Sequence, residues 1–135
     1  MKKIITLMGC VVLLALSACT KQYVPPATTN QTVYEDVAPS DWAPYTDNNG
    51  SSSYTASLNV SILDSNFAAV GGVIVAISYD GGATYEQLPE TYANIAYSYT
   101  YNAGNVSLYA QSADGTTPVQ PTLPMKVKIV LVDSN

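Results

Sequence analysis

An alternating run of apolar and polar residues is the feature that most constrains how this chain of 135 residues folds. Between Tyr54 and Ile62, apolar side chains occupy every second position, and Thr, Ser or Asn fills the positions between them. Successive side chains of a β-strand point to opposite faces of the sheet. The run therefore predicts a strand with one buried face and one solvated face.

Further short apolar segments follow, and none repeats with the helical period of about 3.6 residues. Turn sequences separate them at Asp80-Gly81-Gly82, Asn102 to Asn105 and Asp114-Gly115. The predicted strands are Val70 to Tyr79, Thr84 to Leu88, Tyr92 to Tyr101, Val106 to Gln111, a weaker Thr116 to Val119, and Met125 to Val132. Six or seven such strands predict an all-β domain over residues 51–135, an antiparallel β-sandwich of the immunoglobulin or fibronectin type III kind.

The start of the chain has the three parts of an export signal, since Lys2 and Lys3 precede an apolar run that ends in small residues. The run is shorter than the about 20 apolar residues of a membrane-spanning helix. Its end, Leu16-Ser17-Ala18-Cys19, resembles the lipobox of bacterial lipoproteins. The resemblance implies removal of residues 1–18 as a signal peptide and attachment of a diacylglycerol to the Cys19 sulfur. The membrane is then a partner through this lipid anchor, and Thr20 in the next position favours the outer membrane.

Residues 19–50 are rich in Thr, Pro, Asn and Gln, which predicts a flexible, lipid-anchored linker before the sandwich. The linker contains Trp42, the only tryptophan. Two roles are open for this side chain: it packs onto the end of the sandwich, or it stacks on a ligand. Because Cys10 is removed and Cys19 carries lipid, the mature chain has no internal disulfide.

Charge and composition exclude several classes of function. The mature chain keeps three lysines and ten carboxylates, a net charge of −7, and has no arginine or histidine. Nucleic acid is therefore excluded as a partner, because binding it depends on a basic surface. No metal or other cofactor is expected, and the chain is not expected to be an enzyme, since positioned bases and thiols are lacking. Glu86 and Glu90 are the pair to test for glycosidase chemistry.

One turn motif is recognisable between two predicted strands. Residues 78–85 resemble the Asp-box of sialidase-type propellers and other secreted β-proteins, through Ser78, Asp80, Gly82, Thr84 and Tyr85. The Asp80 carboxylate can accept hydrogen bonds from the turn, while glycines allow positive φ angles. We expect this motif to stabilise a β-hairpin and to have no direct part in glycan chemistry.

Tyrosine is strongly enriched, with eleven copies against one phenylalanine. Tyr97, Tyr99 and Tyr101 alternate along one predicted strand. We expect this row to face the core, because the strand otherwise has little to bury; the alternative is an exposed platform for sugars. Tyr109 alternates out of phase with its apolar neighbours and is the better candidate for an exposed ring.

The sequence thus predicts a non-enzymatic, lipid-anchored envelope lipoprotein that acts as a surface binding module, with neutral carbohydrate as the candidate ligand. The candidate contact residues are Trp42, Tyr97, Tyr99, Tyr101 and Tyr109. The alternative is a structural accessory lipoprotein that docks on an envelope protein. An exposed tyrosine row beside amides would favour carbohydrate, whereas buried tyrosines with an open strand edge would favour protein pairing.

Overall fold

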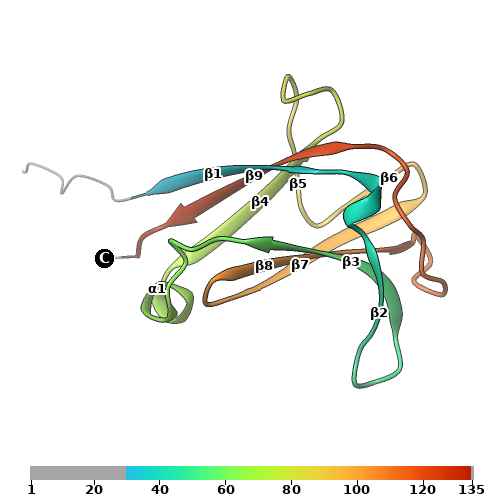
Figure 1. Ribbon diagram of the computed structural model, residues 1–135, viewed down its shortest axis with the longest axis horizontal. Coiled ribbons are helices and arrows are strands. Elements are labelled where there is room, and N and C mark those ends of the chain that lie inside the picture. The colour runs from blue at the N-terminus through green and yellow to red at the C-terminus, as the bar shows by residue number, and fades with distance from the viewer. Residues whose placement is uncertain (1–29, 135) are drawn as a thin grey trace, which may run out of the picture.

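Two antiparallel sheets pack face to face in the computed structural model, which describes residues 30–134 (Figure 1). Sheet I has the strand order β1 (Gln31–Val37), β9 (Met125–Val132), β4 (Gly72–Ser78) and β5 (Glu86–Gln87). Sheet II has the order β2 (Ala43–Thr46), β3 (Ser52–Asn59), β8 (Asn105–Ser112), β7 (Ile95–Asn102) and β6 (Glu90–Tyr92). The predicted all-β antiparallel sandwich is confirmed, with nine strands among the described residues in place of six or seven.

The order of the strands follows the immunoglobulin arrangement, in which one sheet has the order A-B-E-D and the other contains C, F and G. Here β2-β3-β8-β7 corresponds to A-B-E-D, and β4-β9 corresponds to C-F. The position of strand G, beside β9, is filled by β1 from the opposite end of the chain. The strand in the position of G is thus β1, the first of the described strands in the sequence.

The predicted linker is wrong for residues 31–50, because this segment contains β1, a short 3-10 turn (Pro39–Asp41) and β2. Val33 and Val37 of β1 face the core, and Val37 is fully buried. Pro44 is accommodated because β2 is an edge strand that pairs only with β3. The domain therefore begins near residue 30, while the predicted signal peptide, Cys19 and the start of the linker lie outside the described residues.

The core is one cluster filled from the inner faces of both sheets. Alternation along β9 is complete: Met125, Val127, Ile129 and Leu131 are buried, and the residues between them are half-buried. Burying an aliphatic side chain of this size contributes roughly 1.5–3 kcal/mol, so these rows supply most of the stabilisation. The fully buried residues include Leu63, Val75, Ile77, Val106, Leu108, Val127, Ile129 and Leu131.

The sequence did not predict the short helix α1 (Ser65–Val70) that joins β3 to β4. Asp64 caps it, with its Oδ1 accepting a hydrogen bond from the Phe67 backbone N–H at 2.7 Å. Six residues are too few to show a helical period, so only the cap could have indicated it. Residues 30–134 contain no helix long and apolar enough to cross a membrane. The weak strand predicted at 116–119 is reduced to one isolated bridge, between Gln111 and Pro118.

Candidate functional site

The outer face of sheet II carries uncharged polar side chains along its three longest strands. Because the alternate residues of β3, β7 and β8 fill the core, their neighbours must point outward. We call this surface the hydroxyl face; it consists of Thr55, Ser57, Asn59, Ser98, Thr100, Asn102, Asn105, Ser107, Tyr109 and Gln111.

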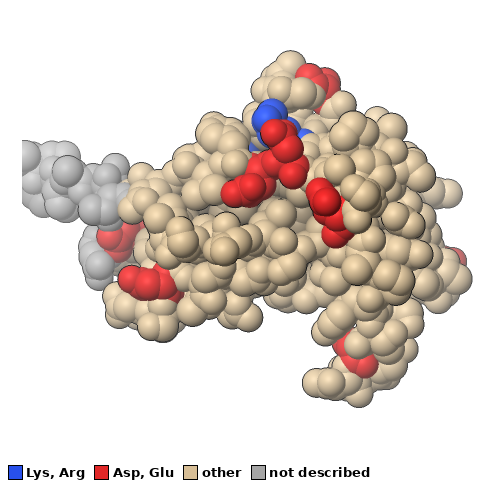
Figure 2. All heavy atoms as spheres, viewed as in Figure 1, with Lys and Arg blue, Asp and Glu red and all other residues tan. Residues whose placement is uncertain are grey.

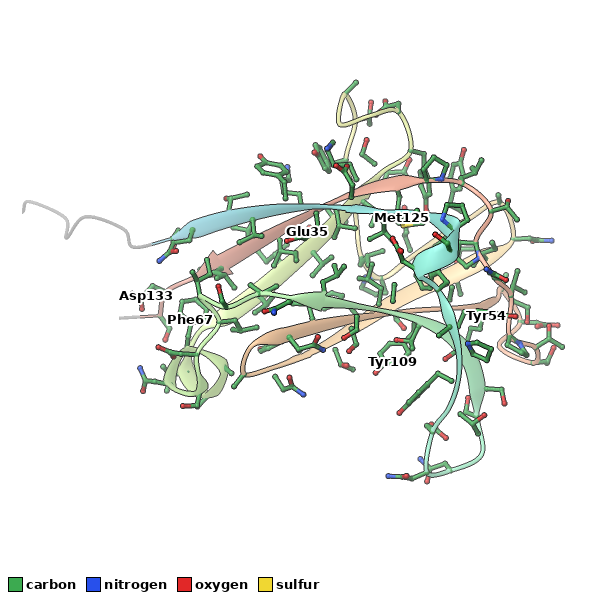
Figure 3. The ribbon with its side chains drawn as sticks, in the orientation of Figure 1. Glu35, Tyr54, Phe67, Tyr109, Met125 and Asp133 are labelled. Carbon is green, nitrogen blue, oxygen red and sulfur yellow. The ribbon has the colours of Figure 1, made fainter. Side chains whose placement is uncertain are left out.

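Tyr109 lies at the centre of the hydroxyl face and points away from sheet I (Figure 3). Its ring packs against Tyr45 of β2, with ring centroids 5.4 Å apart and an interplanar angle of 52°. Its hydroxyl lies 3.3 Å from the Thr100 hydroxyl. These contacts leave Tyr109 half-buried on the outer surface of sheet II, whereas the sequence predicted an exposed ring and no partner for it.

A hollow of about 290 Å³ lies beside the two rings. The side chains of Ser98 and Gln111 in its wall have no hydrogen-bond partner among the described residues, so they can bond to a ligand. A second hollow of about 450 Å³ reaches towards Glu90 on β6 and shares Ser98 and Gln111 with the first. Together they cross sheet II from the β2–β3 hairpin to the β6 edge. The first is lined by Tyr45, Asp47, Ser51, Ser53, Ser98, Thr100, Tyr109 and Gln111.

The row of alternating tyrosines on β7 faces the core, with exposure increasing along the strand. Tyr97 is buried at 4% exposure, Tyr99 is half-buried, and Tyr101 is 38% exposed. The Tyr99 hydroxyl donates to the Val73 carbonyl of the opposite sheet at 2.7 Å. The row is therefore not a platform on the hydroxyl face.

Trp42 is also buried, at 4% exposure, and its ring meets that of Tyr97 edge-on with centroids 6.2 Å apart. Its indole Nε1 is buried without a hydrogen-bond partner among the described residues. Of its two predicted roles, packing onto the sandwich is the one the structure favours. A ligand on the surface cannot stack on Trp42 or Tyr97 as they are placed here.

The Asp-box-like turn between β4 and β5 forms a closed hydrogen-bond network. Asp80 Oδ1 accepts from the Ser78 hydroxyl at 2.7 Å and from the backbone N–H groups of Ala83 and Thr84 at 3.0 and 2.9 Å. The Ser78 hydroxyl in turn accepts from the Gly82 N–H at 2.8 Å. These bonds, led by that from Ser78, lower the pKa of Asp80 to about 2. All of these hydrogen bonds lie within the turn itself, so the motif has a local structural role there.

The sequence interpretation missed a second turn of the same construction after β8. Asp114 Oδ1 accepts from the Ser112 hydroxyl at 2.5 Å and from the Thr116 N–H at 3.0 Å. These contacts lower the pKa of Asp114 to about 2. The repeated Ser-x-Asp-Gly spacing at 78–81 and 112–115 was the available signal.

Glu86 and Glu90 meet where the edge strands β5 and β6 of the two sheets adjoin. Glu90 Oε1 accepts from the Tyr79 hydroxyl at 3.2 Å, and the Tyr79 ring stacks on Tyr92 with centroids 4.0 Å apart. Desolvation, a hydrogen bond with Glu86 and the Glu86 charge raise the pKa of Glu90 to about 7. The two carboxyl groups proposed from the sequence as a pair therefore lie close enough for Glu86 to influence the protonation of Glu90.

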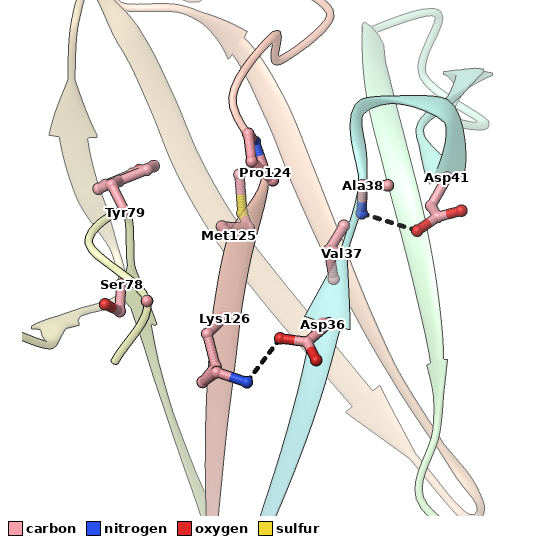
Figure 4. A pocket seen from close by; sticks show the side chains of 10 residues that line it. Asp36, Val37, Ala38, Asp41, Ser78, Tyr79, Pro124, Met125 and Lys126 are labelled. Atoms are coloured by element: carbon pink, nitrogen blue, oxygen red, sulfur yellow. Dashed lines mark hydrogen bonds and ion pairs between the residues drawn. The ribbon is translucent and has the colours of Figure 1, made fainter. Parts of the chain in front are cut away.

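A third hollow of about 330 Å³ opens at the end of the sandwich where β9 begins (Figure 4). Its apolar walls include Val37 and Met125. Its charged groups are already paired: Lys126 Nζ lies 2.6 Å from Asp36 Oδ1, and Asp41 Oδ2 accepts from the Ala38 N–H at 2.8 Å. The pocket therefore offers a ligand fewer unpaired polar groups than the hydroxyl face does.

Lys126 and Lys128 lie on the outer face of sheet I, and Figure 2 shows blue lysine atoms beside red carboxylates at the top of the molecule. Lys128 Nζ sits 4.2 Å from the centre of the Tyr85 ring, a cation–π contact. Within residues 30–134, no group of three or more His, Cys, Asp or Glu side chains is placed to hold a metal ion. Comparison with known proteins finds no matching family model, no matching curated protein and no matching solved structure.

Proposed function

We propose that this chain is a lipid-anchored envelope lipoprotein whose hydroxyl face binds a neutral carbohydrate without chemically changing it. One observation carries the proposal: the Tyr45–Tyr109 ring pair stands over a hollow walled mainly by hydroxyl and amide groups. The outward side chains of β3, β7 and β8 include no ionised group.

A neutral sugar suits this surface on physical grounds. Its ring presents C–H groups that pack against an aromatic face, and its hydroxyls both donate and accept hydrogen bonds. Ser98, Thr100 and Gln111 can do both in return. Because the sugar bears no charge, binding does not require the removal of an ion from water, and the net charge of −7 creates no repulsion.

Two side chains stand at the limits of this surface. Asp47 belongs to the β2–β3 turn, where its Oδ1 accepts the N–H groups of Asn49 and Ser51 at 2.8 Å each. Glu90 stands at the opposite limit, on β6. Asp47 is thus already hydrogen-bonded within its own turn. We expect Tyr109 and Gln111, between these two limits, to make the central contacts with the sugar.

Isothermal titration calorimetry of neutral oligosaccharides against the processed chain tests the proposal. We expect saturable binding, with Kd in the micromolar to millimolar range, to at least one neutral glycan. Tyr109→Ala should weaken binding about tenfold or more, since it removes a stacking ring worth roughly 1.5 kcal/mol. The matched control is Tyr34→Ala, because Tyr34 is 57% exposed on the opposite sheet. Binding to no glycan, or equal losses in both variants, would contradict the proposal.

The alternative, docking on an envelope protein, is favoured by a different observation. Strand β1 is an edge that pairs only with β9, so its outer backbone groups are open to strand addition. Against it, Glu35 shares the core-facing side of β1 with Val33 and Val37, and inward-pointing charges are one way in which proteins protect edges from pairing. We therefore place the carbohydrate first.

A further inference from the structure

Three exposed aliphatic side chains lie at one end of the sandwich. Val70 is 53% exposed, Ile62 is 41% exposed and Ile74 is 39% exposed. Ile62 lies in the loop before α1, Val70 ends α1, and Ile74 lies near the start of β4. These segments meet at the end of the sandwich where β1 begins (Figure 1). We call Ile62, Val70 and Ile74 the tether-end patch.

Two hydrogen bonds bring Asn30, the first described residue, and the C-terminal residues together at this same end. The Asp133 N–H donates to Asn30 Oδ1 at 2.9 Å, and the Ser134 hydroxyl donates to the Val70 carbonyl at 2.5 Å. The chain therefore enters the domain beside the C-terminal residues, which in turn contact Val70. The segment that leads back to Cys19 starts within this neighbourhood.

The number of residues between the lipid and the domain limits how far the domain can stand from the bilayer. Eleven residues separate Cys19 from Gln31. Even fully extended, they span no more than about 40 Å. Since chain entry lies at the tether end, that end is the one held closest to the membrane.

We propose that the tether-end patch rests on the surface of the bilayer that holds the Cys19 lipid. The inference depends on the lipid anchor of the proposed function. Tethering turns this contact into an intramolecular one, with an effective concentration in the millimolar range for a short connection, so a small patch suffices. Branched aliphatic side chains at the interface bury apolar area that otherwise faces water.

The charges at this end favour apolar contact over electrostatic attraction. Asp64 and Asp133 are the nearby ionisable residues, whereas the two described lysines, Lys126 and Lys128, lie on the other half of β9. An acidic end gains nothing from an anionic lipid surface. We therefore expect contact with zwitterionic lipid that depends little on salt.

This orientation has a consequence for the hydroxyl face. The strands of sheet II would run away from the bilayer, so the face would stand upright beside the membrane, open to a ligand that approaches from the side. The far end, with the hollow of Figure 4, would point away from the lipid.

Nitroxide labels on the natively lipidated protein in phosphatidylcholine vesicles test the orientation. With Cys19 held as a thioether, Val70→Cys supplies a single thiol for the label. Leu123→Cys is the matched control, because Leu123 is an aliphatic side chain of similar exposure, 46%, that precedes β9 at the far end. We expect oxygen to relax the label at residue 70 several-fold more than a water-soluble nickel chelate does. At residue 123 the chelate should dominate, and the contrast should persist in about 0.5 M NaCl.

Hydrogen exchange gives a readout that needs no label. We expect vesicles to slow exchange in residues 60–71 of the lipidated wild type several-fold, and Val70→Asp to remove this protection while the unfolding midpoint stays unchanged. Mass spectrometry of the first residue and vesicle flotation separate the possible failures. A chain that lacks lipid and does not float overturns both the anchor and the inference. A lipidated chain that floats, with both labels in water and no slowed exchange, overturns the inference alone.

Discussion

Several aspartates within residues 30–134 stabilise turns or a helix end through hydrogen bonds to nearby backbone N–H groups. Asp47, Asp64, Asp80 and Asp114 each accept backbone N–H groups within a few residues of themselves. A short carboxylate in such a position offers a turn or a helix end the acceptor that the backbone lacks. Glu90 differs, because its partners are side chains, the Tyr79 hydroxyl and Glu86.

The raised pKa of Glu90 makes stability depend on pH near neutrality. Burial first and the Glu86 contact second raise this pKa from its ordinary value of 4.5 to about 7. The folded protein therefore binds the proton more tightly than the unfolded chain does, and the stability contributed by this group falls as pH rises from 4.5 through 7. Because the chain has no histidine, few other groups titrate in this range.

We expect Glu90→Gln to raise the free energy of unfolding at about pH 8 by about 1 kcal/mol, a figure that allows for solvent screening of a partly exposed carboxyl. At about pH 4, where the wild-type carboxyl is mostly protonated in both states, the gain should be small. Glu86→Gln should give part of the same gain by removing the neighbouring charge. Urea unfolding at both pH values measures the difference, and a gain that is equal at the two would contradict this assignment.

Among the strands, those with strict alternation were predictable and those that depend on distant partners were not. Strand β9 has its predicted bounds, Met125–Val132, because every second residue is a large aliphatic one. The sequence predicts a linker where β1 lies, since Val33 and Val37 are its only aliphatic residues and Pro39 follows. Its strand conformation depends on pairing with β9, which lies about 90 residues later and leaves no local trace.

The pairing of β1 with β9 predicts where the domain begins. A chain that starts at Asn30 should unfold at the same temperature as the longer protein. A chain that starts at Pro39 lacks β1, loses the fully buried Val37 and exposes the edge of β9. We expect it to be destabilised by at least about 2 kcal/mol and to self-associate. Thermal unfolding and size-exclusion chromatography measure the two effects. Equal unfolding midpoints for the two chains would show that β1 is not part of the folded domain.

At the scale of elements, the site was predictable only in part. Tyr109 could be placed outside because its apolar neighbours Leu108 and Ala110 had to face the core. Its partner Tyr45 could not be found, because β2 lay within the presumed linker. The hydroxyl face could not be predicted, because it depends on the strand register that places Thr55, Tyr109 and Ser98 side by side on three strands.

Across the whole molecule, a single core predicts a single unfolding transition. Trp42 contacts Tyr97 of sheet II and belongs to the same buried cluster as Val127 and Ile129 of sheet I, so its environment reports on both sheets at once. We expect blue-shifted tryptophan emission in the native state. Loss of this emission and loss of the far-ultraviolet circular dichroism should follow one curve in urea, as two-state unfolding requires.

The same experiment separates the two predicted roles of Trp42. Because its ring is 4% exposed, a saturating neutral glycan should leave the emission maximum unchanged, even though it raises the unfolding midpoint by mass action. A reducing agent should leave that midpoint unchanged as well, since Cys19 is the only cysteine after the predicted cleavage and cannot form a disulfide within the chain. Two separate transitions would show that the sheets unfold independently, and a shift in emission on binding would place Trp42 at the ligand.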